Sequence, residues 1–135
     1  MDLQLNGARV LVTGGSRGIG RAIVEAFLDE GATVGFCARN AEEVEATQQA
    51  LQGRGTVVGS AVDVGDADAL AAWVAESAEA FGGLDVVVSN AAGYAAGELV
   101  DLSAADWEAL RRTNVDGLFH LAQAEIGRAS CRERV

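Results

Sequence analysis

Three glycines near the start of the chain have the spacing of a loop that can hold a phosphate. They are Gly14, Gly18 and Gly20, within the stretch TGGSRGIG that begins at Thr13. Glycine lets the backbone bend sharply and lets an anion come close, because no Cβ is in the way. An apolar run precedes the stretch and a helical pattern follows it, so the first N–H groups of a helix would face the anion. The sequence predicts a dinucleotide-binding bend, with a tight turn that only packs a helix as the alternative.

The elements that would position this bend alternate along the chain. Apolar, largely valine-rich runs at 8–14, 32–38, 56–62 and 84–91 predict strands, and stretches with helical spacing lie between them, one of them at 41–55. Strands that are apolar without alternation indicate a sheet buried on both faces. With right-handed crossovers, this pattern predicts an α/β fold with a doubly wound parallel sheet in the order 3-2-1-4. A crevice between the first and fourth strands would receive the ligand.

Two more helices are predicted from their capping residues. Asp66 is a cap candidate for a helix that continues to Phe81, and Ser103 with Asp106 forms a capping box. After Ser103 the apolar face is expected to begin with Trp107 and Leu110.

The end of the chain differs in character from the rest. Residues 126–135 contain three arginines and match the in-frame translation of a common sequencing-adapter oligonucleotide over all ten positions. We therefore interpret 1–125 as a truncated domain whose later strands are missing, and 126–135 as a non-native tail. A natural solvated basic end is the alternative.

Composition excludes several classes of function. The chain has 135 residues, enough for one domain, and a net charge of −10, which argues against nucleic-acid and anionic membrane partners. All ten basic residues are arginine, and the sequence contains no lysine. The two cysteines lack metal or disulfide spacing and His120 is a single histidine, so we expect no metal site and a cytoplasmic location.

Four motifs in order resemble those of the short-chain dehydrogenase/reductase family. TGGSRGIG is similar to its cofactor motif, VDV at 62–64 to the segment whose aspartate touches adenine, NAAG at 90–93 to its signature after the fourth strand, and NVDGLF at 114–119 to its helix segment with a catalytic-site asparagine. The resemblance covers residues 1–125. Counted from Asp85, the signature reads SNAA, with Ser89 at the family's first asparagine and Ala92 at its glycine.

The resemblance implies a Rossmann fold and hydride transfer between NADP(H) and a small carbonyl or alcohol substrate, with a 3-oxoacyl reductase as one example. It also implies that the whole protein is a homo-oligomer. The residues that it implies for cofactor binding are Thr13, Gly14, Ser16, Arg17, Gly18, Ile19, Gly20, Arg39, Asp63, Val64, Asn90, Ala91 and Ala92.

The identity of the cofactor depends on the end of the second predicted strand. NAD-binding members carry an acid there, at the position of Ala38, which would bond the ribose hydroxyls. Here Arg39 follows, and Arg17 lies within the glycine-rich stretch. Arginine forms charge-assisted bonds to a phosphate, so NADP is expected rather than NAD. The alternative is that Arg39 only ends a strand in solvent.

The resemblance assigns Asn114 a catalytic role, in organising a water for proton relay. The family's proton donor is a tyrosine with a lysine four residues later, together with a serine. The one tyrosine of this chain, Tyr94, is followed at that distance by Glu98, so the sequence predicts an active parent oxidoreductase and an inactive 135-residue piece. A non-catalytic NADP-binding or regulatory module and an isomerase or dehydratase are the alternatives.

Overall fold

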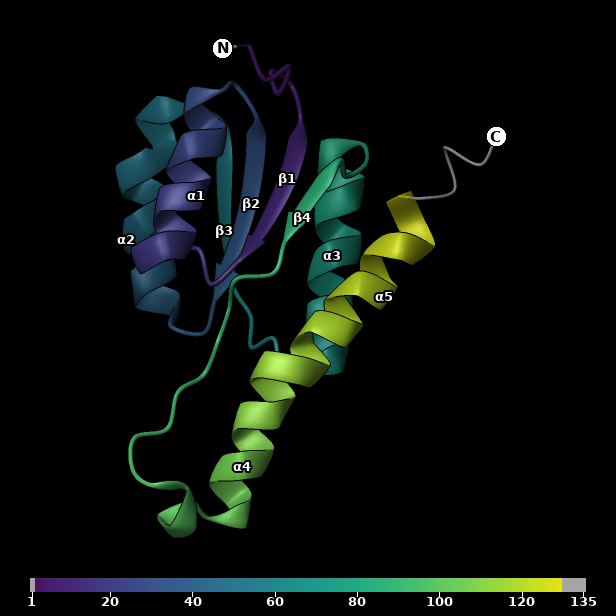
Figure 1. The fold of residues 1–135 in the computed structure, drawn as a ribbon. Helices are drawn as coiled ribbons and strands as arrows, with labels where there is room; N and C mark the ends of the chain where they lie inside the picture. The colour runs from purple at the N-terminus through teal and green to yellow at the C-terminus, as the bar shows by residue number, and fades with distance from the viewer. Residues whose placement is uncertain (1, 130–135) are drawn as a thin grey trace.

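The computed structural model describes residues 2–129 and contains a four-stranded parallel sheet between helices (Figure 1). The strands are β1 (Arg9–Thr13), β2 (Thr33–Ala38), β3 (Val57–Ala61) and β4 (Val86–Val88). Their order is β3-β2-β1-β4, as the sequence predicts. Val10 of the central strand β1 pairs with both Val34 and Val86, which sets the register on either side.

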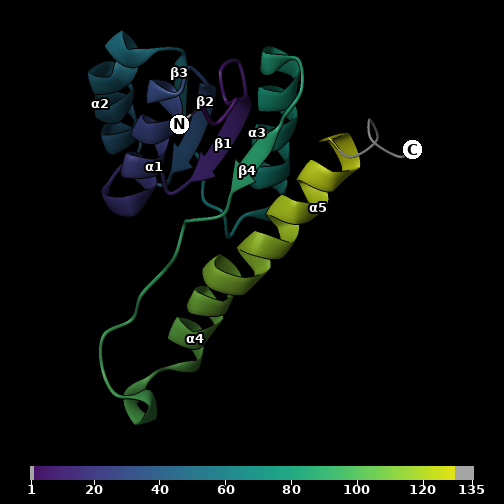
Figure 2. The ribbon, with the colours of Figure 1, turned by 45° about the horizontal axis from the view of Figure 1, so that its top comes forward.

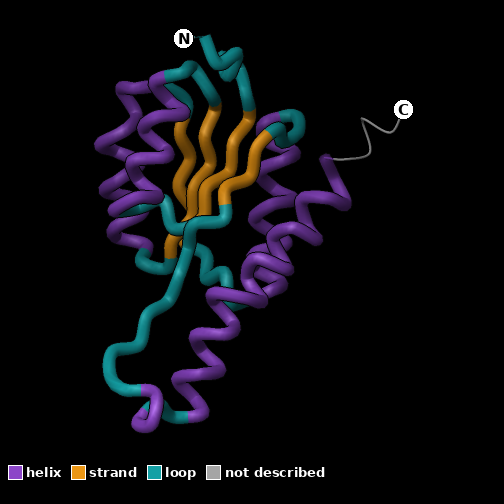
Figure 3. The backbone as a smooth tube through the Cα atoms, viewed as in Figure 1, coloured by secondary structure: helices purple, strands orange, loops and turns teal. Residues whose placement is uncertain are grey.

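Helices cover both faces of the sheet. Helices α1 (Gly18–Asp29) and α2 (Ala41–Leu51) lie on one face, and α3 (Ala67–Phe81) and α5 (Gly117–Ala129) lie on the other (Figures 1 and 3). Helix α4 (Ala104–Arg111) continues into α5 through a π-helical segment, η3 (Arg112–Asp116). Two short 3₁₀ turns, η1 (Gln52–Arg54) and η2 (Leu99–Asp101), complete the described elements.

The core has two parts, one on each face of the sheet. Val10 and Val12 of β1 face the cluster under α1 and α2, together with Val24 and Phe36. Leu11, between them, belongs to the cluster under α3 and α5. Because successive side chains of a strand point to opposite faces, a strand covered on both sides must be apolar throughout. This arrangement explains the uninterrupted apolar runs.

Side-chain caps begin three of the helices. Asp66 accepts a hydrogen bond from the Ala69 N–H at the start of α3, and Ser103 accepts one from the Asp106 N–H at the start of α4, as predicted. Asn40 caps α2 in the same way. Helix α2 ends at Leu51 instead of running to residue 55, because the 3₁₀ turn η1 follows and Gly55 has a φ of 152° that no helix allows.

The apolar face that is predicted to begin with Trp107 and Leu110 is not buried along α4. Trp107 is 57% exposed, and none of the eight residues of α4 is buried. The reason is visible in Figure 2, where α4 projects beyond the end of the sheet and only α5 runs alongside α3. Leu121 of α5 reaches the core instead and is 2% exposed.

The predicted domain limit falls inside α5, which continues through residue 129. Most of the predicted non-native tail, residues 130–135, lies outside the described residues. Between residues 2 and 129, the helices are all too short or too polar to span a lipid bilayer.

Candidate functional site: a cavity at the carboxyl edge of the sheet

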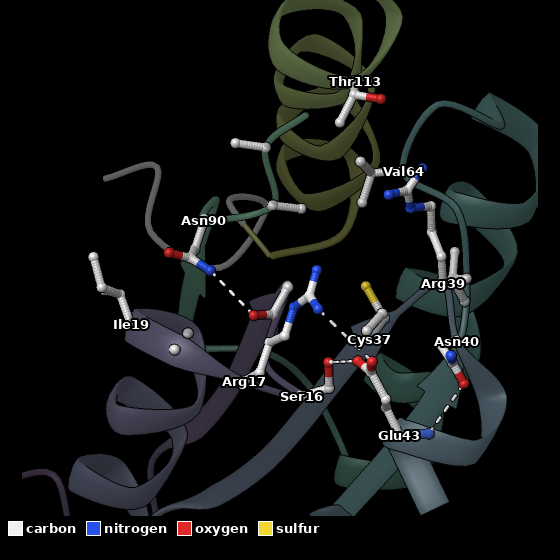
Figure 4. A pocket seen from close by; sticks show the side chains of 17 residues that line it. Ser16, Arg17, Ile19, Cys37, Arg39, Asn40, Glu43, Val64, Asn90 and Thr113 are labelled. Carbon is white, nitrogen blue, oxygen red and sulfur yellow. Dashed lines mark hydrogen bonds and ion pairs between the residues drawn. The ribbon is translucent and has the colours of Figure 1, made fainter. Parts of the chain in front are cut away.

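A cavity of about 510 Å³ opens where the carboxyl ends of the four strands meet (Figure 4). The segments that follow β1, β2, β3 and β4 all contribute to its wall, and η3 contributes one residue. Ligands of open parallel sheets bind at this edge, next to the point where the strand order reverses. The lining residues are Gly14, Ser16, Arg17, Gly18, Ile19, Gly20, Cys37, Ala38, Arg39, Asn40, Glu43, Val62, Val64, Asn90, Ala91, Ala92 and Thr113.

The glycine-rich bend needs its glycines for two different reasons. Gly18 has a φ of 57° and open space on its Cβ side, so its role is conformational. A Cβ on Gly20 would collide with the carbonyl oxygen of Gly14 and with the side-chain amide of Asn90. The bend is therefore closed tightly against the end of β4, and the wall of the cavity at this point is bare backbone.

Helix α1 begins at this bend without a side-chain cap. Its N-cap residue, Arg17, makes no capping hydrogen bond with its side chain. Among the described residues, the first turn of α1 contains no acidic residue. The first N–H groups of a helix have no acceptor inside the helix, and the residues that carry them here, Gly18, Ile19 and Gly20, line the cavity. Such an end attracts an anion through both hydrogen bonds and the helix dipole.

Thr13 and Asn90 tie the bend to the end of β4. The Thr13 hydroxyl accepts hydrogen bonds from the backbone N–H groups of Asn90 and Ala91, at 3.0 and 3.1 Å. The Asn90 side-chain amide donates to the carbonyl oxygens of Thr13 and Gly14, at 3.1 and 3.2 Å. Thr13 is 1% exposed and lies behind the wall, whereas Ser89 is exposed. Asn90 thus makes the cross-strand contacts.

Three charged side chains surround one side of the cavity. Arg17 and Ser16 both point to the carboxylate of Glu43, with Arg17 Nη1 3.8 Å from Oε1 and Ser16 Oγ 3.4 Å from Oε2 (Figure 4). Arg39 is exposed and extends along the Val64 side. The two arginines meet at one cavity although they lie 22 positions apart in the sequence.

Cys37 lies in the cavity wall and is fully buried. Burial raises the pKa of its thiol to about 12, although a backbone hydrogen bond from Gly14 acts in the opposite direction. The carbonyl oxygen of Cys37 accepts the N–H groups of Gly14 and Gly15, so β2 also holds the bend.

Of the two predicted binding residues after β3, one lines the cavity and the other does not. Val64 lines the cavity and is 6% exposed. Asp63 is exposed, outside the cavity lining, and its Oδ1 accepts the Gly65 N–H at 2.8 Å. In this structure Asp63 shapes the turn after β3.

Asn114 also lies outside the cavity lining, within the π-helical segment η3. Its Oδ1 accepts the Gly93 N–H at 2.6 Å, and its Nδ2 donates to the Gly93 carbonyl oxygen at 3.1 Å. Asn114 thus clamps the segment after β4, while its neighbour Thr113 lines the cavity. π-helical turns inside α-helices are frequent at functional sites.

Sequence reasoning missed several lining residues, above all Glu43 and Thr113. Glu43 could have been found from Asn40, because a capping residue at the end of β2 places position 43 in the first helical turn beside the bend. Thr113 carried no such signal. Within residues 2–129, no three side chains of the metal-binding types gather in one place.

Three comparisons with known proteins bear on this site. A model of the short chain dehydrogenase family matches residues 8–128. Gluconate 5-dehydrogenase of Gluconobacter oxydans (strain 621H) is 38% identical over 121 residues, which make up 89% of this chain and 47% of that protein.

Solved structures of the same kind superpose closely. A short chain dehydrogenase from Burkholderia cenocepacia J2315 in complex with NADP has a TM-score of 0.88 and 37% identity, over 93% of this chain and 52% of that one. L-sorbose reductase from Gluconobacter frateurii, complexed with NADPH and L-sorbose, has a TM-score of 0.88 and 29% identity, over 94% and 49%. This chain therefore spans about half the length of the relatives it matches. With the parallel sheet, the glycine bend and the cavity in the same chain, these matches show that it belongs to the short-chain dehydrogenase family.

Proposed function

We propose that the chain binds NADP(H) and belongs to an oxidoreductase that interconverts a small carbonyl compound and the corresponding alcohol. The observation that carries this proposal is the cavity itself, which has an uncapped helix N-terminus at the glycine bend and two arginines nearby. A dinucleotide with a pyrophosphate and a 2′-phosphate has two anionic parts, and both find matching groups here.

Different residues of the cavity would contact different parts of the dinucleotide. The amides of Gly18, Ile19 and Gly20 would hold the pyrophosphate, and Val64 with Ala91 would contact the adenine ring and its ribose. Thr13 and Asn90 would keep the bend in place from behind. The nicotinamide supplies the hydride when it is bound.

Arg39 and Arg17 are proposed to select NADP over NAD. The end of β2 offers the small side chain of Ala38 in place of a carboxylate that would repel a 2′-phosphate. The relatives solved with NADP and NADPH support this choice. Asn114 and Asp63, which lie outside the cavity lining, would act through the segments after β4 and β3 that they hold.

Substitution of Arg39 tests the cofactor assignment. Arg39→Gln removes the charge and Arg39→Asp reverses it, so the affinity for NADPH should fall by about tenfold in the first variant and more in the second. The affinity for NADH should change little, which shifts the preference towards NADH. Titration followed by NADPH fluorescence measures both.

Arg54→Gln serves as the control for lost charge. Arg54 lies in η1 after α2, pairs with Asp29 and Glu25, and is not among the residues that line the cavity. Its loss should leave both affinities within about twofold. Equal NADPH affinity in wild type and Arg39→Asp would remove the assignment of the 2′-phosphate.

We propose that residues 1–135 alone do not turn over substrate, since the sequence has no lysine, and Tyr94, which is 89% exposed, stands four residues before Glu98. The whole protein is proposed to be a cytoplasmic homo-oligomer; the exposed Leu118 and Phe119 of α5 support association.

The second candidate is a binding module without chemistry. It would use the same cavity and the same two arginines. A serine and a Tyr-x-x-x-Lys segment elsewhere in the whole protein would decide for the enzyme, and their absence would decide for the module.

A further inference from the structure

We propose that Glu43 is a specificity-determining residue of this site, which lowers the preference for NADPH over NADH by competing with the 2′-phosphate for Arg17. This inference rests on the proposed function, because the competition exists only if a dinucleotide occupies the cavity. It adds a residue that neither the glycine motif nor the end of β2 contains.

The position of Glu43 is fixed by the cap of α2. The Asn40 side chain accepts the N–H groups of Glu42 and Glu43, at 3.0 and 3.1 Å, which fixes the first turn of the helix, and Thr47 of the same helix donates to the Ser16 carbonyl oxygen at 2.8 Å. From there the Glu43 side chain reaches Ser16 Oγ at 3.4 Å and Arg17 Nη1 at 3.8 Å (Figure 4). Ser16 is 7% exposed, so this carboxylate reaches one nearly buried residue of the bend as well as the exposed Arg17.

The charges around the cavity explain why this contact matters. Among the described residues that line it, Arg17 and Arg39 are the cations, and Glu43 carries the one carboxylate. A phosphate monoester bears between one and two negative charges at neutral pH, so a 2′-phosphate near Arg17 would be repelled by Glu43. Arg17 would also have to exchange its carboxylate partner for the phosphate.

The same carboxylate does not repel NADH at this position. It presents a 2′-hydroxyl in place of the phosphate, and a hydroxyl can donate a hydrogen bond to a carboxylate. Glu43 therefore weakens the binding of NADPH without weakening the binding of NADH. It does so from another position than the acid that NAD-binding members carry at the end of the second strand.

The contact contributes little to folding, which makes the substitution informative. The Arg17 side chain is 81% exposed and that of Glu43 is 42% exposed, and ion pairs of this kind add almost nothing to stability. Glu43→Gln keeps the size of the side chain and an oxygen that can accept from Ser16.

The experiment measures the affinities of four ligands for wild type, Glu43→Gln and Glu42→Gln by calorimetry in low salt. The ligands are NADPH, NADH, 2′,5′-ADP and 5′-AMP, so each pair differs in the 2′-phosphate. Glu42→Gln is the matched control, because Glu42 occupies the same helical turn and shares the Asn40 cap but lies outside the cavity lining. Circular dichroism checks that both variants fold.

Glu43→Gln should tighten NADPH and 2′,5′-ADP by about fivefold, since one unit charge about 4 Å away changes affinity by a factor of about five in water. NADH and 5′-AMP should not tighten, and Glu42→Gln should leave all four ligands within about twofold. If wild type binds NADPH but both variants behave alike, Glu43 has no such role while the proposed function stands. Weaker binding of all four ligands to Glu43→Gln would show that Glu43 only positions Arg17 and would overturn the inference. If none of the proteins binds NADPH or 2′,5′-ADP, the proposed function fails and the inference fails with it.

Discussion

The hydroxyl of Thr13 holds two backbone amides, those of Asn90 and Ala91, and so joins the ends of β1 and β4. Valine has nearly the same shape and would fit the strand, but it would leave two partly buried N–H groups without an acceptor. An unpaired buried donor costs about 1–3 kcal/mol, so the hydroxyl is what this position requires. A single buried oxygen thereby holds the segment after β4 against the end of β1.

Cys37 faces the cavity, yet its thiol should be unreactive at neutral pH. The thiolate is the reactive form, and burial raises the pKa of Cys37 to about 12. In a Cys131→Ser background, where Cys37 is the one remaining thiol, Ellman's reagent at pH 8 should react at least about a hundredfold more slowly with the folded chain than in urea. Equal rates would mean that Cys37 is accessible and ionised.

The same shift in pKa predicts how stability changes with pH. The pKa of Cys37 in the folded chain lies above the value of about 8.5 expected for an unfolded thiol. The contribution of the protonated thiol to the free energy of unfolding is therefore fully present below pH 8.5. As the pH rises from there towards 12, the unfolded chain loses the proton first, and the free energy of unfolding should fall by up to about 1.4 kcal/mol per pH unit. Urea denaturation of Cys37→Ala, which has no thiol there, should lack this part of the slope.

At the scale of elements, local signals in the sequence predicted the strands and the helix caps well. Contacts between distant segments could not be predicted in this way. The strands and the caps Asp66 and Ser103 follow from residues next to each other in the sequence. The exposure of Trp107 does not, because it depends on whether another element lies over α4. Glu43 and Thr113 could not be predicted as lining residues for the same reason, because it is the fold that brings α2 and η3 to the edge of the sheet.

The π-helical segment η3 is the element that holds the segment after β4. Asn114→Ala would remove both hydrogen bonds to Gly93, each worth about 0.5–1.5 kcal/mol. We expect hydrogen exchange of residues 90–98 to accelerate by about tenfold, while exchange in β1 and β2 stays unchanged.

Asn114→Asp provides the graded control. It keeps an oxygen that can accept the Gly93 N–H but loses the donor to the Gly93 carbonyl oxygen. Its exchange rates should lie between those of wild type and Asn114→Ala. Unchanged rates in both variants would show that Asn114 does not hold this segment.

For the whole molecule, the net charge of −10 contrasts with the cavity that we assign to an anionic ligand. The general field repels a dinucleotide, so binding must come from groups placed at short range: the uncapped start of α1 and the two arginines. The carboxyl edge of the sheet is where these groups converge. The architecture therefore decides the function more than the composition does.

The central claim is that the glycine bend holds the dinucleotide, and amide chemical shifts test it most directly. In ¹H–¹⁵N spectra of the 135-residue chain, saturating NADPH should produce the largest shifts at Gly18, Ile19 and Gly20, with further shifts at Asn90 and Ala91. The amides of α4, which contributes no residue to the cavity lining, should stay in place. Unchanged resonances at the bend, or the largest shifts in α4, would contradict the account.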